Sequence, residues 1–154
     1  MYPGKALLPA LAGLLLATAA QADDSAELVY RQKLMQLIGA NNGAINHIVK
    51  NDLPHRDQIA TYARAIEGAG ALVEGAFKKR IVEGRTDSKP EVWERWDEYA
   101  AAAAKMSQAA AALAVAAEGG DGAALRGAMR SLGATCGGCH KIFRKPKAER
   151  FKRD

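Results

Sequence analysis

The chain is poor in cysteine, in aromatic side chains and in strand-like patterns. Its 154 residues include two cysteines, and aromatic residues make up 6% of the sequence. No segment alternates apolar and polar residues with the period of two that half-buried β-strands show. Internal repeats and low-complexity linkers are also missing from the sequence. The length suffices for one domain with its own core, and these absences argue against sheet and repeat architectures.

Apolar residues recur instead at intervals of three and four, in four blocks that predict amphipathic helices. Pro90 suits a first helical position, and Gly119-Gly120 ends the third block. The longest predicted loop covers residues 78–89. Mostly short connections between the blocks favour an all-α fold, an up-down-up-down four-helix bundle. The predicted helices span approximately residues 25–50, 57–77, 90–117 and 121–145.

The N-terminus has the three parts of a secretory signal peptide. Lys5 supplies the positive charge, residues 6–20 are an apolar run, and Ala20-Gln21-Ala22 is a small-residue cleavage site. The run is shorter than the roughly 20 residues that span a bilayer, so we expect no stable membrane insertion. The sequence therefore predicts a signal peptide over residues 1–22 and a single exported domain over residues 23–154.

The spacing Cys136-Gly137-Gly138-Cys139-His140 is typical of a c-type haem attachment site. Two thiols three positions apart lie on one face of a helix, where they can form thioethers to the two vinyl groups of one haem. His140 lies one turn beyond Cys136, so its imidazole can reach the iron as the proximal ligand. Export agrees with this prediction, because covalent haem is attached outside the cytoplasm in bacteria.

Three other interpretations compete for the same cysteines. A redox-active Cys-x-x-Cys pair normally opens the helix of a βαβ unit, and no strand-like segment precedes this one. A four-ligand zinc site needs a second pair of ligands, and only His47 and His55 remain. A disulfide between Cys136 and Cys139 would leave His140 without a role.

Bundle geometry narrows the choice of residue on the other side of the iron. The first and fourth helices are expected to be antiparallel neighbours, so the end of the fourth lies beside the start of the first. Met35 lies ~15 Å from that start at 1.5 Å per residue, whereas His47 lies at the far end and His55 in the following turn. Met35 is therefore either the distal iron ligand or a flexible core residue over the porphyrin.

Two arginines lie one helical turn from the axial candidates. Arg31 precedes Met35 by one turn and either pairs with a haem propionate or is a solvated side chain beside Glu27. Arg144 follows His140 by one turn. It either stabilises the proximal pocket electrostatically or complements the C-terminal dipole of its helix.

At these positions the chain resembles the class II c-type cytochromes, the cytochrome c′ family with its low-spin relatives. The resemblance covers essentially the whole exported domain and implies haem c on the fourth helix, with His140 proximal and Met35 on the distal side. It also implies that Arg31 approaches a propionate, that Arg144 lies near the proximal histidine, and that the chain forms homodimers through its first two helices. The resemblance is carried by Tyr30-Arg31-Gln32, Met35, Lys89-Pro90-Glu91-Val92-Trp93, the haem motif and Phe143-Arg144.

The leading functional prediction is a periplasmic haem protein that carries single electrons to and from redox partner proteins. The alternative is a five-coordinate cytochrome c′ that binds nitric oxide or carbon monoxide at a vacant distal site. An enzyme is not expected, because no acid–base constellation accompanies the haem motif. Export argues against nucleic acid, and the basic tail at residues 145–153 suits an acidic redox partner.

Overall fold

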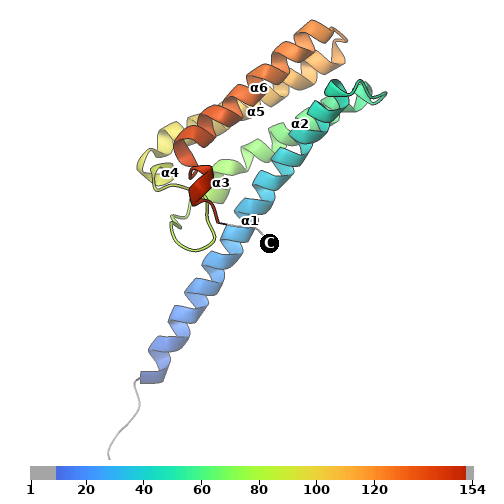
Figure 1. Cartoon of the computed structure of the whole chain (residues 1–154). Coiled ribbons are helices and arrows are strands. Elements are labelled where there is room, and N and C mark those ends of the chain that lie inside the picture. The colour runs from blue at the N-terminus through green and yellow to red at the C-terminus, as the bar shows by residue number, and fades with distance from the viewer. Residues whose placement is uncertain (1–9, 152–154) are drawn as a thin grey trace, which may run out of the picture.

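The computed structural model describes residues 10–151, with side chains described from residue 24 onward. Within that part the chain is helical and contains no named strand, and the long helices form the predicted four-helix bundle (Figure 1). The elements are α1 (Ala10–Lys50), η1 (Arg56–Gln58), α2 (Ile59–Ala71), α3 (Val73–Phe77), α4 (Glu91–Glu94), α5 (Trp96–Glu118), α6 (Gly122–Phe143) and η2 (Lys147–Glu149).

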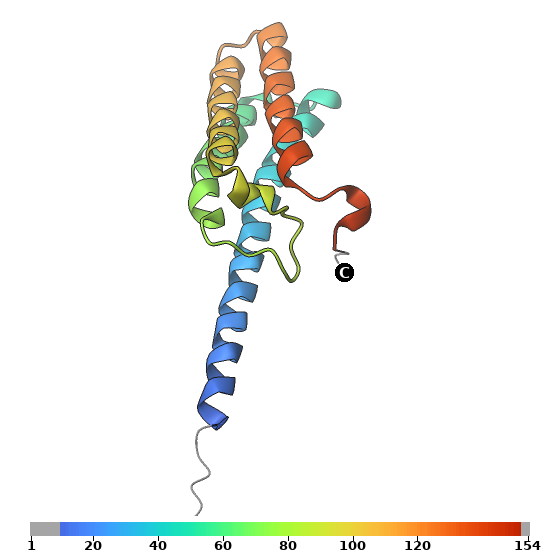
Figure 2. The same ribbon diagram turned by 90° about the vertical axis from the view of Figure 1, so that its left-hand side faces the viewer.

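Helices that follow one another in the chain pack against each other, whereas the first and the last long helix do not pack closely. α2 packs against α1 and α5, and α5 packs against α6, whereas α1 and α6 make few close backbone contacts. The first and fourth helices line the same cavity from two sides and do not pack closely against each other. Figure 2 shows this separation between the blue and red helices. The gap is where the functional site lies.

Branched aliphatic side chains hold the bundle together. The largest fully buried residues come from every long helix and from α4, and each contributes about 1.5 to 3 kcal/mol by leaving water. Alanine and glycine on α2 and α5 allow the two helices to approach closely: Ala63, Ala69, Gly70 and Ala110 are all buried. The fully buried set is Ile45, Ile59, Ile66, Val92, Leu113 and Leu132.

The first helix begins earlier than predicted. The expected start near Asp24 or Ser25 is wrong, because α1 runs unbroken from Ala10 through these positions. The alanines and leucines upstream are strong helix formers, which accounts for the extension. Figure 1 shows this part of α1 projecting beyond the bundle. The predicted signal peptide falls on residues 1–9, outside the described residues, and on this extension, so its cleavage stays a prediction.

Two predicted helices are interrupted. The second is divided at Leu72 into α2 and α3, and the third is divided at Arg95, whose φ of −127° and ψ of 49° are not helical. The break at Arg95 separates α4 from α5, and the Nε1 of Trp93 on α4 donates a 2.8 Å hydrogen bond to the carbonyl of Phe77. Apolar spacing could not reveal this break, because the exposed Arg95 falls between apolar positions without disturbing their period.

The last helix starts as predicted and ends early. The Asp121 carboxylate accepts a 2.7 Å hydrogen bond from the backbone N–H of Ala123, which caps α6. The predicted end at Lys145 is wrong, because α6 stops at Phe143 and Arg144 is extended. Arg144 forms an antiparallel bridge with Ser88, in which the backbone N–H groups of Lys89 and Lys145 donate to the carbonyls of Phe143 and Asp87.

One described helix, α5, is long and apolar enough by composition to cross a membrane. It lies in the bundle, where Tyr99, Ala103, Ala110, Leu113 and Ala114 are buried against neighbouring helices. Its high hydropathy comes largely from its alanines.

Candidate haem-binding site

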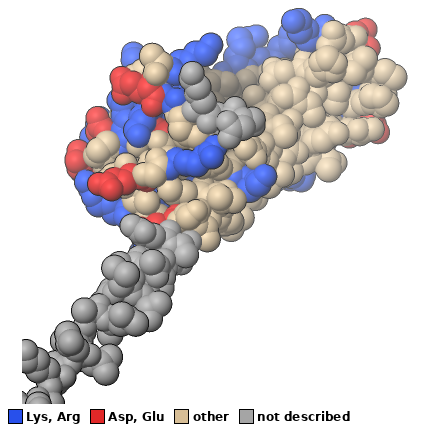
Figure 3. All heavy atoms as spheres, turned by 60° about the horizontal axis from the view of Figure 1, so that its bottom comes forward, with Lys and Arg blue, Asp and Glu red and all other residues tan. Residues whose placement is uncertain are grey.

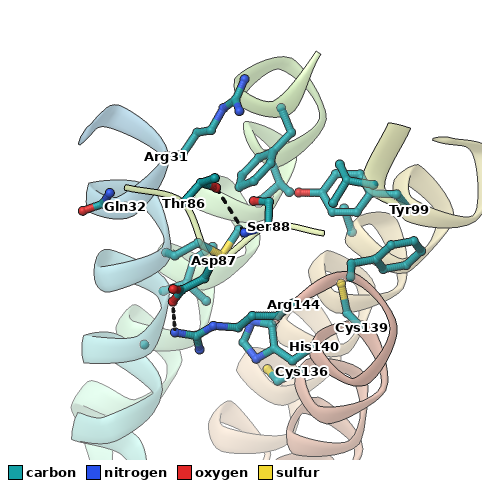
Figure 4. A pocket seen from close by; sticks show the side chains of 18 of the residues that line it. Arg31, Gln32, Thr86, Asp87, Ser88, Tyr99, Cys136, Cys139, His140 and Arg144 are labelled. Carbon is teal, nitrogen blue, oxygen red and sulfur yellow. Dashed lines mark hydrogen bonds and ion pairs between the residues drawn. The ribbon is translucent and has the colours of Figure 1, made fainter. Parts of the chain in front are cut away.

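A cavity of about 350 Å³ lies between α1 and α6, and the loop after α3 closes one end of it (Figure 4). α1 and α6 supply opposite walls, while α3, α4 and α5 supply the base. The structure brings together around this cavity every residue that the sequence singled out for the site. These residues are Arg31, Met35, Cys136, Cys139, His140 and Arg144.

Cys136 and Cys139 line the cavity from one face of α6 and are half-buried. Burial raises the pKa of both thiols, and with the neighbouring Cys136 it brings the pKa of Cys139 to about 11. Reactive Cys-x-x-Cys pairs in redox enzymes depend instead on a lowered thiol pKa. The redox-pair interpretation therefore has no electrostatic support here.

The structure supports neither of the two remaining interpretations, a disulfide and a zinc site. Cys136 and Cys139 are not joined by a disulfide. Among the described residues, no group of three or more His, Cys, Asp or Glu side chains lies close enough together to hold a metal ion. A zinc site of the tetrahedral type consequently has no ligand set in this part of the chain.

His140 points into the cavity beside the two cysteines (Figure 4). Desolvation by neighbouring atoms, with the positive charges of Arg144 and Arg150, lowers the pKa of its imidazole. A lowered pKa keeps the ring neutral at pH 7, and the neutral ring has the lone pair that a metal ligand needs.

The wall opposite α6 is formed by α1. Met35, Gly39 and Asn42 line the cavity at positions separated by four and three residues, so they share one helix face. Met35 is half-buried. His47 and His55 are both exposed and do not line the cavity, as the bundle geometry predicted.

Arg31 is buried, with 3% of its surface exposed, so the interpretation as a solvated side chain is wrong. Its Nε donates to the carbonyl of Ala76 at 2.8 Å and its Nη2 donates to the carbonyl of Lys79 at 2.6 Å. The guanidinium also lies 5.0 Å from the ring centre of Phe77 and 5.7 Å from that of Trp93. Burial lowers the pKa of Arg31, although Glu27 partly opposes the effect.

Arg144 is turned toward the loop after α3 rather than along its own helix. Its Nη2 lies 2.9 Å from the Oδ2 of Asp87, in an ion pair whose carboxylate side chain is 11% exposed. Figure 4 shows this pair beside His140. Sequence reasoning did not include Asp87, since nothing in the loop's composition indicated that it folds back onto α6.

Nη1 of Arg31 and the hydroxyl oxygen of Tyr99 are buried at the border of the cavity and have no hydrogen-bond partner within the described part of the chain. Burial of a polar group without a partner costs free energy, so both atoms call for an acceptor outside the protein. A haem presents two carboxylates, and two thiols with one imidazole are the donors that attach it. The residues present therefore fit haem c.

Tyr99 was also missed by sequence reasoning. It lies one turn after Trp96, and its ring packs edge-on against Phe143, with 5.2 Å between ring centres. A tyrosine placed on an otherwise apolar helix stripe was the available signal, because a buried hydroxyl needs a partner.

The family model described as Cytochrome C' matches residues 16–144, which include the bundle, the cavity and the cysteine pair. The chain belongs to the cytochrome c′ family. The resemblance noted in the sequence is thereby confirmed. So is the cofactor, because proteins of the cytochrome c′ family bind covalently attached haem c.

Relatives within and beside the family are similar over most of their length. A cytochrome c′ of Pararhodospirillum photometricum is 37% identical over 125 residues, 80% of this chain and 100% of that protein. A cytochrome c′ of Rhodospirillum rubrum is 35% identical over 140 residues, 90% of this chain and 95% of that protein. A cytochrome c-554 of Cereibacter sphaeroides is 35% identical over 120 residues, 75% of this chain and 78% of that protein.

Solved structures agree with the cytochrome c′ fold. Cytochrome c prime from Shewanella frigidimarina superposes with a TM-score of 0.74 at 25% identity, covering 80% of this chain and 97% of that one. The nitric oxide complex of a mutant cytochrome c prime from Alcaligenes xylosoxidans superposes with a TM-score of 0.70 at 28% identity and the same coverage.

Proposed function

We propose that this haem protein is a periplasmic one-electron carrier in which Met35 and His140 are the two axial ligands. The observation that carries the proposal is that Met35 and His140 line one cavity from opposite helices, α1 and α6. When bound, haem c supplies an iron that exchanges single electrons at a potential set by its axial ligands and surroundings.

In this proposal the chain's own residues attach, orient and shield the cofactor. Cys136 and Cys139 would form the two thioethers, and His140 would ligate the iron with a neutral ring. Arg31, through Nη1, and Tyr99, through its hydroxyl, would donate to the haem carboxylates, which would satisfy both of these unpartnered atoms. The apolar side chains of Val73, Phe77 and Val92 exclude water from the base of the cavity.

No enzymatic activity is included in the proposal. General acid–base catalysis would need a titratable side chain on the Met35 side of the cavity. The cavity wall contributed by α1 consists of apolar residues, Arg31, two glutamines, Gly39 and Asn42. An amide neither accepts nor releases a proton at neutral pH, so this wall offers no general base.

A redox partner protein with an acidic surface suits the charge distribution. The full chain has a net charge of +5. Lys and Arg side chains gather, with fewer Asp and Glu among them, at the end of the bundle from which α1 projects (Figure 3). Opposite charge on a partner accelerates association and orients the encounter.

We also propose a homodimer formed through the first two helices. Val29 and Leu37 on α1 are each 51% exposed, and Leu72 at the end of α2 is 53% exposed. Large apolar side chains exposed on adjacent elements are what a self-complementary helix interface buries. Sedimentation or light scattering of the haem-loaded protein measures this state directly.

Gas binding is the second proposed function. It is favoured by the similarity to a cytochrome c prime solved as a nitric oxide complex. In that case Met35 packs beside a vacant iron position and the cavity admits the gas.

Absorption spectra of the ferric and ferrous protein, before and after carbon monoxide, distinguish the two functions. A carrier with Met35 bound is low-spin in both states and reacts weakly with the gas. A high-spin ferric spectrum with rapid carbon monoxide binding would overturn the carrier and favour the gas-binding protein.

A further inference from the structure

The second half of the loop between α3 and α4 is bonded to the end of α6. The backbone N–H of Lys89 donates to the carbonyl of Phe143 at 3.0 Å, and the N–H of Lys145 donates to the carbonyl of Asp87 at 2.7 Å. The Nζ of Lys145 adds a 3.0 Å bond to the carbonyl of Thr86. Backbone bonds on both sides of Asp87 thus fix its position relative to α6.

The carboxylate of Asp87 is held where it faces Arg144. The two side chains lie 2.9 Å apart and are largely shielded, with 11% of Asp87 and 28% of Arg144 exposed. Among the described residues that border the cavity, Asp87 is the only carboxylate, whereas Arg31, Arg85 and Arg144 are cationic. Asp87 is therefore the one negative side chain that balances these charges from within the cavity wall.

Arg144 is close enough to His140 to act on it electrostatically. The two side chains lie side by side in Figure 4; His140 is in the last turn of α6, and Arg144 is the residue that follows the helix. In agreement, the charge of Arg144 contributes to the lowered pKa of His140. The positive charge of Arg144 therefore also acts on a metal ion that His140 ligates.

We propose that Asp87 is a positioning residue for the haem: it fixes the Arg144 guanidinium beside His140, offsets its charge and so lowers the reduction potential. The inference rests on the proposed role of His140 as iron ligand. An uncompensated cation near the iron favours the reduced form, which carries one positive charge less. In a partly buried site this interaction is screened less than it is at the surface.

The test is the midpoint potential of the haem-loaded protein in four variants. Asp87→Asn keeps the shape of the side chain and removes its charge, so the potential rises. Arg144→Gln removes the positive charge of the pair and leaves the negative charge of Asp87 in place, so the potential falls. The double variant returns the potential close to that of the parent. Asp97→Asn makes the same chemical change at an exposed position on α5 and is the matched control.

The proposal requires Asp87→Asn to raise the potential by more than Asp97→Asn does. An equal or smaller shift overturns it, even if thermal stability falls, because a purely structural role affects stability alone. Should Asp87→Asn accumulate without haem, Arg144→Gln still tests the pair, and an unchanged potential in that variant overturns the proposal.

The absorption spectrum of the parent separates this outcome from a failure of the proposed ligation. Histidine-ligated haem in the parent, together with no differential shift in the variants, rejects only the role of Asp87. A parent spectrum without histidine ligation rejects the proposed site itself, and with it the premise of this inference.

Discussion

The Nη2 of Arg31 donates a 2.6 Å hydrogen bond to the backbone carbonyl of Lys79, just beyond the end of α3. Together with the bond from Nε to the carbonyl of Ala76, it lets one side chain of α1 cap the C-terminus of a helix 45 residues further on. Trp93 closes the same corner by donating to the carbonyl of Phe77. Arg31 therefore joins three elements at the base of the cavity, in addition to its proposed bond to the haem.

Arg31→Ala should lower the free energy of unfolding by about 2 to 4 kcal/mol, because two charge-assisted hydrogen bonds are lost and two carbonyls lose their donor. Chemical denaturation of the haem-loaded protein measures the change. Arg64→Ala is the control, since Arg64 pairs with Glu118 on the surface, where the loss of an ion pair has a much smaller effect on stability. Equal effects of the two substitutions would contradict the anchoring role of Arg31.

Haem attachment should depend on both cysteines. The mass of the exported protein is expected to equal that of the chain from Asp23 plus one haem. Treatment with acid and acetone, which removes non-covalent haem, should leave the haem on the parent protein. When both Cys136 and Cys139 are replaced by alanine, the same treatment should remove all of the haem. Retention of haem in that double variant, or an unmodified parent mass, contradicts thioether attachment.

Met35→Ala distinguishes the two proposed functions. If Met35 is bound to iron, the variant becomes high-spin, and its affinity for carbon monoxide rises by roughly tenfold or more. That factor corresponds to a lost competing ligand worth at least about 1.4 kcal/mol. Met129→Ala, on the core side of α6, is the control and should leave the spectrum unchanged. A Met35→Ala spectrum identical to the parent's argues that Met35 only packs.

Gly70 and Gly68 on α2 should respond oppositely to alanine. A Cβ at Gly70 would lie 2.3 Å from the Oγ of Ser107 on α5, so Gly70→Ala should destabilise the bundle by about 1 to 3 kcal/mol. A Cβ at Gly68 meets nothing within 4 Å, so Gly68→Ala should stabilise it by about 0.5 to 1 kcal/mol. Thermal unfolding of the two variants checks this, and a stabilised Gly70→Ala would refute the close α2–α5 approach.

The sequence by itself determined the all-α bundle, the attachment motif and six of the residues that line the cavity, but not Asp87 or Tyr99. Apolar spacing at three and four fixes which face of each helix is buried, and short connections fix their antiparallel order. The rise of 1.5 Å per residue then placed Met35 and Arg31 at the level of His140, because the distance of a residue from the end of its helix depends only on its position in the chain. The same arithmetic placed His47 and His55 away from the site.

Only the tertiary structure decided which distant residues the connecting segments contact. The loop after α3 has no apolar period, so its return to α6 and the pairing of Asp87 with Arg144 could not be read from residue spacing. Near the break at Arg95, Trp93 donates to Phe77, 16 residues away, and at the early end of α6, Arg144 pairs with Asp87, 57 residues away. Sequence patterns report which surfaces must be buried locally, whereas the choice of a distant hydrogen-bond partner depends on how the finished bundle brings the segments together.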